Sequence, residues 1–229
     1  ATGSTFVVSQ ADTIGSLAAA FVRRHASDAQ PFFLMTDVVA PHAGTPRDPD
    51  DPSMPTPAVS PAYRNVFAGQ PLQDPSFNEA DISDKPAQLA PLTPAEIRAE
   101  VEVNAQRREA LLSAQDALDA VIDALDESGE LSRTFVVVTS DNGYLLGEHR
   151  IRSGKMAPYE VANHMPLYIR GPGIPAGTSF TGLTSQVDLA PTLARMAGVP
   201  LRSAWRLDGE SMLYRLRHRT AAHSTRPGV

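Results

Sequence analysis

The chain has 229 residues, of which 20 are Lys or Arg and 26 are Asp or Glu, so its formal net charge is −6. This mild acidity argues against a nucleic-acid partner, whose binding surface is normally basic. The complete absence of cysteine excludes a disulfide, a thiolate metal site and a cysteine nucleophile within these residues.

The sequence contains neither a membrane span nor a signal peptide. No stretch approaches the ~18 apolar residues that a span needs, and the first residues lack the basic and apolar regions of a leader. An initiator methionine is also missing. We therefore expect a segment of a longer protein or a mature form, and its compartment is left open.

The first predicted elements are a helix, a strand and a long loop. Apolar residues recur at helical spacing over Thr13–Arg24. The apolar run Pro31–Val39 has the length and flanks of a buried strand. Twelve of the 20 prolines lie between Pro41 and Pro94, a density that excludes a sustained helix or a central strand. A loop is therefore expected over 41–94, either functional or a surface excursion without a role.

A long helix is predicted after this loop. Thr93 and Glu96 form a capping box, with Pro94 at the first helical position and Gly129 as a natural stop. The apolar stripe expected to face the core consists of Ile97, Val101, Leu111, Leu112, Leu118, Val121, Ile122 and Leu125.

Two further strands and one helix complete the pattern. Thr134–Ser140 and Pro166–Arg170 predict buried strands, and Asp188–Ala197 predicts a short helix. Strands that alternate with helices indicate an α/β protein with a mainly parallel sheet flanked by helices. We predict one domain portion over 1–200, which includes the proline-rich loop 41–94, and an arginine-rich extension over 201–229 that is partly disordered.

Polar residues follow two of the predicted strands, where open α/β sheets bind ligands. Asp141 and Asn142 offer a carboxylate and an amide oxygen, and Gly143 lets the chain turn sharply beside them. Such oxygens suit Ca²⁺ or Mg²⁺ better than zinc, although an ordinary Asx turn is the simpler alternative. His42 follows the first strand and could donate to an anionic oxygen or a leaving group, or it could be a solvated loop residue.

Lys155 is one of only two lysines and follows Gly154. It could hold an anionic substrate oxygen as a point charge, or it could be an ordinary exposed lysine. The chain has no P-loop, dinucleotide fingerprint, zinc-protease motif or serine elbow.

Taken in order, the blocks resemble one family. They are Pro-His after an apolar strand, a proline-rich loop with Ser-Phe-Asn-Glu and Asp-Lys-Pro, a capped helix, Thr-Ser-Asp-Asn-Gly-Tyr, Gly-Glu-His-Arg, Gly-Lys, Pro-Tyr-Glu, Ile-Arg-Gly-Pro-Gly and Asp-Leu-Ala-Pro-Thr-Leu. This order resembles the later part of the sulfatase catalytic domain, of the arylsulfatase and N-acetylglucosamine-6-sulfatase kind. The resemblance covers about 31–209 and implies the alkaline-phosphatase-like α/β fold, incomplete in this chain.

The resemblance also implies roles for individual residues. Asp141 and Asn142 match two ligands of the family's divalent cation, usually Ca²⁺. His42 and Lys155 match catalytic residues that contact the sulfate group or its bridging oxygen. His149 belongs to a motif common in the family, without an assigned role.

The family's nucleophile is a formylglycine made in a Cys/Ser-x-Pro-x-Arg motif, and this motif is absent. The nearest pattern, Ser53-Met54-Pro55-Thr56-Pro57, has proline in place of arginine. We therefore predict that the parent protein hydrolyses a sulfate ester of a small molecule or glycan and that this chain alone is inactive. Two alternatives stay open, a phosphate or phosphonate ester hydrolase of the same superfamily and a non-catalytic binding or structural module.

Overall fold

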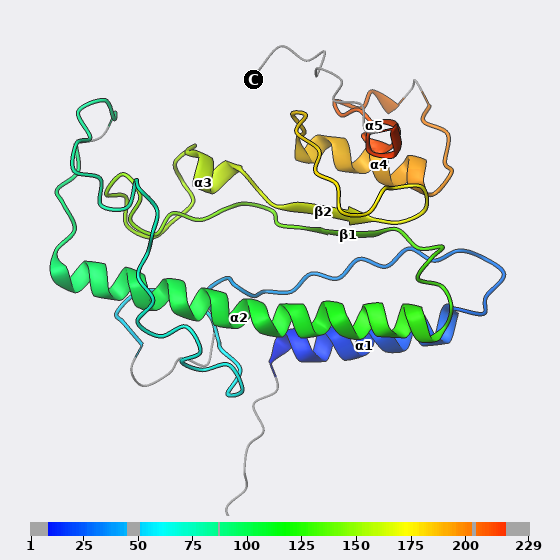
Figure 1. Ribbon diagram of the computed structural model, residues 1–229, viewed down its shortest axis with the longest axis horizontal. Coiled ribbons are helices and arrows are strands. Elements are labelled where there is room, and N and C mark those ends of the chain that lie inside the picture. The colour runs from blue at the N-terminus through cyan, green and yellow to red at the C-terminus, as the bar shows by residue number, and fades with distance from the viewer. Residues whose placement is uncertain (1–8, 45–50, 87, 203–204, 219–229) are drawn as a thin grey trace, which may run out of the picture. The chain divides into compact units, whose positions relative to one another are not determined.

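The computed structural model describes residues 9–44, 51–86, 88–202 and 205–218, and they fall into two compact units (Figure 1). The first unit holds the described residues up to Leu131 together with 139–166, and the second holds 132–138 and 167–218. The elements are α1 (Gln10–His25), α2 (Pro94–Glu127), β1 (Val136–Thr139), α3 (Glu160–Asn163), β2 (Leu167–Arg170), the 3₁₀ turn η1 (Gln186–Asp188), α4 (Leu189–Met196) and α5 (Leu213–His218). None of the helices in the described ranges is long and apolar enough to cross a membrane.

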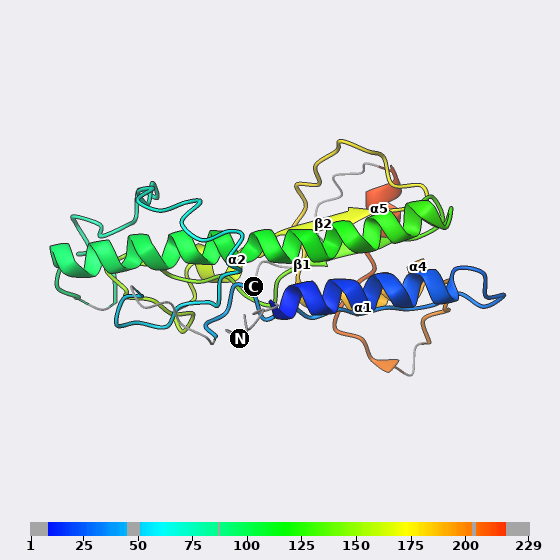
Figure 2. The same cartoon turned by 90° about the horizontal axis from the view of Figure 1, so that it is seen from below.

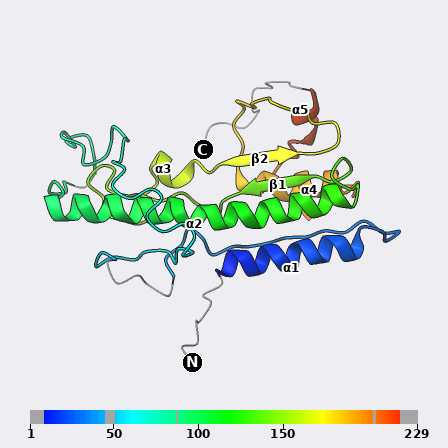
Figure 3. The same ribbon diagram turned by 60° about the horizontal axis from the view of Figure 1, so that its bottom comes forward.

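Helices α1 and α2 pack side by side and run in the same direction (Figures 2 and 3). Gly15 of α1 lies against Ala117 of α2, and Arg23 near the end of α1 pairs with Glu127 at the end of α2 at 2.8 Å. A Cβ on Gly15 would lie 2.6 Å from the Cα of Ala117, so the two backbones approach too closely for a larger side chain.

The predicted limits of α2 are confirmed, but its buried face differs from the predicted stripe. The capping box of Thr93 and Glu96 forms as expected, and Gly129 follows the helix with a φ of 74°. The buried residues of α2 are mainly small or polar: Glu100, Val103, Ala105, Gln106, Glu109, Ala110, Ser113, Ala117, Ala124 and Leu125. Of the predicted stripe only Leu125 is buried, and Leu111 is exposed. The close approach of α1 selects small residues on this face, which hydrophobic periodicity alone does not reveal.

The predicted buried strand over Pro31–Val39 is wrong for the structure as described. The segment is extended but forms no ladder with any described residue. Its side chains alternate: Phe33 and Met35 are exposed, whereas Phe32 and Leu34 are half-buried. On the inner side the ring of Phe32 meets that of Phe21 of α1 edge-on at 5.7 Å. The segment therefore has the conformation and period of a strand without the partner that would complete it.

Because the outer side chains of this segment are solvated, their replacement should affect association rather than stability. The double variant Phe33→Thr/Met35→Thr is expected to scatter less light at high concentration, since exposed apolar strand faces promote aggregation. Its urea unfolding should change by less than about 0.5 kcal/mol. The matched control Phe32→Thr/Leu34→Thr should lose about 2 kcal/mol from the inner face. Equal losses for the two pairs would contradict this orientation.

The proline-rich loop forms no helix or strand in its described part, as predicted, and it packs against α2. Phe67 lies under the guanidinium of Arg108 at 4.0 Å, and its N–H donates to Glu109 Oε1 at 2.9 Å. Gln106 donates to Asp51 at 2.6 Å, which explains why polar residues of α2 are buried here. Hydrogen bonds that involve side chains take the place of the regular ladder that proline prevents.

The sheet within the described residues consists of β1 and β2 alone, and the two strands run antiparallel. Phe135, which precedes β1, lies against Gly171, which follows β2. At the other end of the pair, Thr139 Oγ1 at the end of β1 donates to Pro166 O just before β2 at 2.9 Å. The predicted burial of both strands is wrong, because Val138 is 37% exposed and Tyr168 is 69% exposed. Two strands cannot cover their own faces.

In the second unit, the predicted helix after residue 188 is confirmed as α4. Asp188 is buried and accepts from the backbone N–H of Ser185 at 3.0 Å and of Glu210 at 2.8 Å. This carboxylate fastens α4 to the chain that leads into α5. The extension over 201–229 was predicted to be partly disordered. Of it, residues 203–204 and 219–229 lie outside the described residues.

Candidate active site

The turn after β1 carries the two predicted metal ligands. Asn142 N–H donates to Asp141 Oδ1 at 2.9 Å, and the Asn142 side-chain amide donates to Gly143 O at 2.7 Å. Each bond joins a side chain to the backbone of a directly neighbouring residue, one position closer than in an Asx turn, and the second restrains the amide of Asn142. Gly143 is required here because a Cβ would lie 1.9 Å from Val161 O.

Lys155 lies beside this turn because the chain doubles back on itself. Leu145 and Gly154 form an antiparallel bridge, with N···O distances of 2.7 and 3.1 Å. Leu145 is fully buried and anchors the bridge. As a result the ammonium of Lys155 donates to Asn142 Oδ1 at 3.0 Å, so two predicted residues 13 positions apart meet directly.

The loop that bears Lys155 is held by a buried carboxylate that sequence reasoning missed. Glu100 of α2 is only 1% exposed and accepts from Ser153 N–H at 3.0 Å and Ser153 Oγ at 2.7 Å. Burial raises the pKa of Glu100, and the two bonds from Ser153 oppose that rise. A carboxylate within the buried face of a predicted helix is the signal that could have identified this anchor.

His42 lies on an exposed turn of the proline-rich loop. Its Nδ1 lies 3.0 Å from Ala43 O, and because a carbonyl only accepts, Nδ1 carries the hydrogen. Nε2 is therefore the nitrogen that remains for a ligand. The backbone N–H of His42 donates to Val39 O at 2.7 Å, which closes the turn.

Arg107 of α2 connects the His42 turn with the residues after β1. Its guanidinium donates to Pro41 O at 2.9 Å and lies 4.0 Å from the ring centroid of Tyr144. Desolvation lowers the pKa of Arg107 from its ordinary value. Sequence reasoning missed this residue, although Val103, Arg107 and Ala110 share one helix face and an arginine among buried residues was the available signal.

His149 does not join this group in a direct contact. Its Nδ1 lies 2.6 Å from Glu79 Oε2, and its ring centroid lies 4.2 Å from that of Tyr159. Glu79 comes from the Ser-Phe-Asn-Glu block of the loop, which is bound here through a bridge between Phe77 and Glu148. These two sequence blocks are therefore one structural unit.

The donor chemistry of the turn fits part of a site for a hard cation. A carboxylate and an amide oxygen on adjacent residues are suitable ligands, but Ca²⁺ takes about six to eight oxygens. Across the described ranges no group of three or more His, Cys, Asp or Glu side chains comes together as a metal site. Asp141 and Asn142 could thus supply a minority of the ligands.

Solved structures define the class of protein. A Bacteroides thetaiotaomicron protein from work on the metabolism of multiple glycosaminoglycans has the same fold, with a TM-score of 0.68, 19% identity and coverage of 93% of this chain and 40% of that chain. A complex with D-glucosamine-2-N,6-O-disulfate gives a TM-score of 0.51 and 32% identity over 56% of this chain and 26% of that one. A phosphonate monoester hydrolase from Silicibacter pomeroyi gives a TM-score of 0.52 and 31% identity, with coverage of 61% of this chain and 26% of that chain. The fold is the alkaline-phosphatase-like α/β fold, present here in part.

The family follows from the sequence comparisons. Residues 11–199 match the family model Sulfatase, so the chain belongs to the sulfatase family. It is 32% identical over 204 residues to an arylsulfatase of Volvox carteri. It is 31% identical over 194 residues to the N-acetylglucosamine-6-sulfatase of Capra hircus.

The chain spans about a third of the length of these curated relatives. The two matches cover 82% and 83% of this chain, but only 31% of the algal protein and 33% of the goat protein. The matched region therefore corresponds to one portion of each relative.

Proposed function

We propose that this chain supplies one side of the active site of a sulfuric ester hydrolase that acts on a sulfated sugar or small molecule. The observation that carries the proposal is the 3.0 Å contact between Lys155 Nζ and Asn142 Oδ1. It joins the residue predicted to hold the sulfate with a residue predicted to hold the cation. The relatives named after sulfated sugars support this substrate class.

Lys155 is suited to hold a sulfate oxygen. It is exposed, its ammonium has three donors, and Asn142 Oδ1 uses one of them. The remaining donors can bind the anionic group without any change in the bridge of Leu145 and Gly154. A compact positive charge at this point stabilises the negative charge that grows as the S–O bond breaks.

His42 is suited to protonate the departing alcohol. Because its Nδ1 hydrogen is used by Ala43 O, Nε2 of the neutral ring is an acceptor, and only the imidazolium can donate there. In hydrolysis the sulfur gains a bond to an oxygen nucleophile, supplied from outside these residues, as its bond to the bridging oxygen breaks. The bridging oxygen takes the Nε2 proton and leaves as the alcohol. Arg107 holds the turn that orients the ring.

Asp141 and Asn142 would contribute two oxygens to a divalent cation, Ca²⁺ in the proposal. Such an ion supplies positive charge that neutralises the sulfate oxygens. The remaining ligands and the formylglycine would come from sequence outside these 229 residues, since the nucleophile motif is absent from them. The isolated chain is therefore expected not to turn over aryl sulfates and to bind Ca²⁺ only weakly.

One observation favours a second function. The chain is 31% identical to a phosphonate monoester hydrolase over 61% of its length. Lys155 and His42 would serve a tetrahedral phosphonate as well as a sulfate, because both present anionic oxygens around a central atom. This alternative keeps the residue roles and changes the substrate.

The two lysines of the chain allow a direct test. With ¹³C-labelled lysine the protein gives only the side-chain signals of Lys85 and Lys155. Titration with 4-nitrophenyl sulfate should shift the Lys155 signal and leave Lys85, which is paired with Asp84 at 2.7 Å, unchanged. Parallel titration with 4-nitrophenyl phosphonate distinguishes the alternative, because the larger shift identifies the preferred anion.

Four outcomes would contradict the proposal. Equal shifts of both lysines would indicate nonspecific ion binding, and an unshifted Lys155 would remove its role. Turnover of 4-nitrophenyl sulfate by the purified chain, or tight Ca²⁺ binding in a calorimetric titration, would show that the site is complete without further residues.

A further inference from the structure

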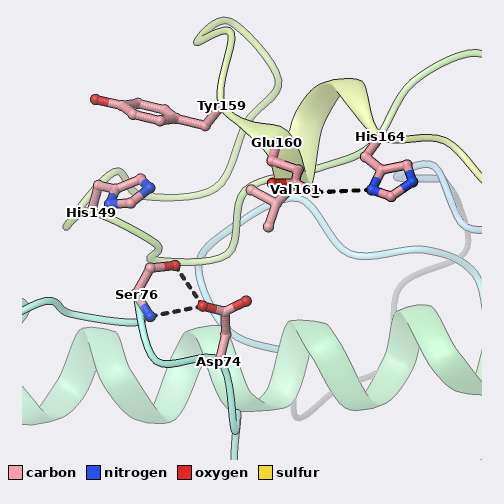
Figure 4. A pocket seen from close by; sticks show the side chains of 7 residues that line it. All are labelled: Asp74, Ser76, His149, Tyr159, Glu160, Val161 and His164. Carbon is pink, nitrogen blue, oxygen red and sulfur yellow. Dashed lines mark hydrogen bonds and ion pairs between the residues drawn. The ribbon is translucent and has the colours of Figure 1, made fainter. Parts of the chain in front are cut away.

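A pocket of about 490 Å³ opens in the first unit, outside the group formed by Lys155 and Asn142. Three stretches of the chain line it, through Asp74, Ser76, His149, Tyr159, Glu160, Val161 and His164. In Figure 4 Tyr159 and His149 lie on one side, Glu160, Val161 and His164 on the other, and Ser76 and Asp74 below them. A volume of this size suits a small organic ligand.

We propose that this pocket binds a neutral, hydroxyl-rich ring, such as the sugar that carries the sulfate ester. The inference rests on the proposed function, because it assigns the remainder of the substrate to a second group of residues. Three features of the pocket support it: fixed polar atoms, an unfavourable environment for anions, and a backbone connection to the candidate site.

The polar atoms of the pocket are fixed before any ligand enters. Glu79 holds His149 Nδ1 at 2.6 Å and Tyr159 packs against the ring, so Nε2 remains for a ligand. Ser76 donates to Asp74 Oδ1 from its N–H at 2.7 Å and from its hydroxyl at 2.5 Å, which leaves Oδ2 as an acceptor. An imidazole and a carboxylate held in this way can exchange hydrogen bonds with vicinal hydroxyl groups.

The lining is unfavourable for the sulfate group itself. Asp74 and Glu160 both lie in the wall. Glu160 Oε1 lies 3.0 Å from His164 Nδ1, whereas bonds from Ser76 keep the pKa of Asp74 below its usual value, so Asp74 is the carboxylate that an entering anion would meet. An anion here would meet like charge, whereas hydroxyl groups would find acceptors. The Tyr159 ring adds an apolar surface for the face of a ring.

The pocket adjoins the candidate site through the backbone. Val161 lines the pocket, and its carbonyl accepts from Tyr144 N–H at 3.1 Å. Gly143 N–H in turn donates to Ala162 O at 2.9 Å. The wall of the pocket is thus paired with the residues that directly follow Asp141 and Asn142, as expected if one ester contacts both places.

The test uses N-acetylglucosamine, which is neutral and unsulfated, and glucuronate as its anionic counterpart. The imidazole signals of His149 and His164 are followed by NMR in the whole 229-residue chain. N-Acetylglucosamine should shift His149, and glucuronate should bind at least tenfold more weakly. The variants Asp74→Asn and Tyr159→Leu should weaken N-acetylglucosamine binding at least tenfold, whereas His218→Asn in the second unit should not.

Hydrogen exchange in α2 identifies variants that fail to fold. Tyr159→Phe, which keeps the ring, should retain N-acetylglucosamine binding, and Asp74→Asn alone decides the test if Tyr159→Leu unfolds. An unshifted His149, or binding that is insensitive to Asp74→Asn, would overturn the inference. If Lys155 still responds to 4-nitrophenyl sulfate in that case, the proposed function stands and the pocket proposal alone fails. If His149 responds to N-acetylglucosamine but Lys155 does not respond to 4-nitrophenyl sulfate, the pocket is supported and the anion site is contradicted.

Discussion

Gly143→Ala is expected to cost about 3 kcal/mol of unfolding free energy, the upper end for an overpacked site. The new Cβ would lie 1.9 Å from Val161 O and 2.9 Å from the Cα of Ala162. These are backbone atoms that cannot rotate away, so the pairing of 143–144 with 161–162 must open. Because Asn142 is the preceding residue, the contact between Lys155 and Asn142 should be lost as well.

Gly154→Ala is the matched control, because this glycine lies in the neighbouring bridge and an added Cβ there would make only an ordinary van der Waals contact. The nearest atom to its added Cβ is Arg152 O at 3.9 Å. The control should retain the stability of the parent within about 0.5 kcal/mol. Urea unfolding followed by circular dichroism measures both variants, and the ¹³C signal of Lys155 reports the local geometry. Equal stability of the two variants would refute the close approach at Gly143.

Glu100→Ala is expected to cost about 3 kcal/mol at neutral pH. It leaves the N–H and hydroxyl of Ser153 without their acceptor in a buried place, and unmade buried hydrogen bonds typically cost about 1–3 kcal/mol each. Glu100→Gln keeps one acceptor oxygen and should lose about 1 kcal/mol. The Lys155 signal should broaden in Glu100→Ala, since residue 153 is the anchor of its loop, and stay sharp in Glu100→Gln.

The pH dependence of these variants distinguishes the charge from the hydrogen bonds. Burial raises the pKa of Glu100 above its usual 4.5, so the native state binds the proton more tightly than the unfolded chain. The stability from this group is complete below about pH 4.5 and is lost as pH rises through the native pKa. The parent protein should therefore lose stability relative to Glu100→Gln as pH rises above 4.5. If the stability of the parent and that of Glu100→Gln change in the same way with pH, burial does not raise the pKa of Glu100.

Local signals predicted the helices α1, α2 and α4, whereas the short helices α3 and α5 were not predicted, and the predicted Thr13–Arg24 misses the first residues of α1. Ser9 and Asp12 cap α1, and Thr93 and Glu96 cap α2, in each case through bonds between residues three positions apart. Such contacts depend only on neighbouring residues, so the sequence contains all the information that they need. The capping box of Thr93 was accordingly predicted to the residue.

The strand predictions were less successful because the burial of a strand depends on the segments that pack against it. The run Pro31–Val39 has the alternation of a strand, yet it finds no ladder among the described residues, and β1 and β2 leave Val138 and Tyr168 exposed. A strand satisfies its backbone only with a partner from elsewhere in the chain. Periodicity identifies the segment, and the pairing has to come from tertiary structure.

The sequence by itself determined which residue types follow the strands and the order of blocks that marks a sulfatase. It could not determine that Lys155 meets Asn142, that Arg107 connects the His42 turn with Tyr144, or that Glu79 holds His149. Each of these contacts joins residues between 13 and 70 positions apart. They form because α2 and the bridge of Leu145 and Gly154 bring distant loops together, and only the packed structure specifies that arrangement.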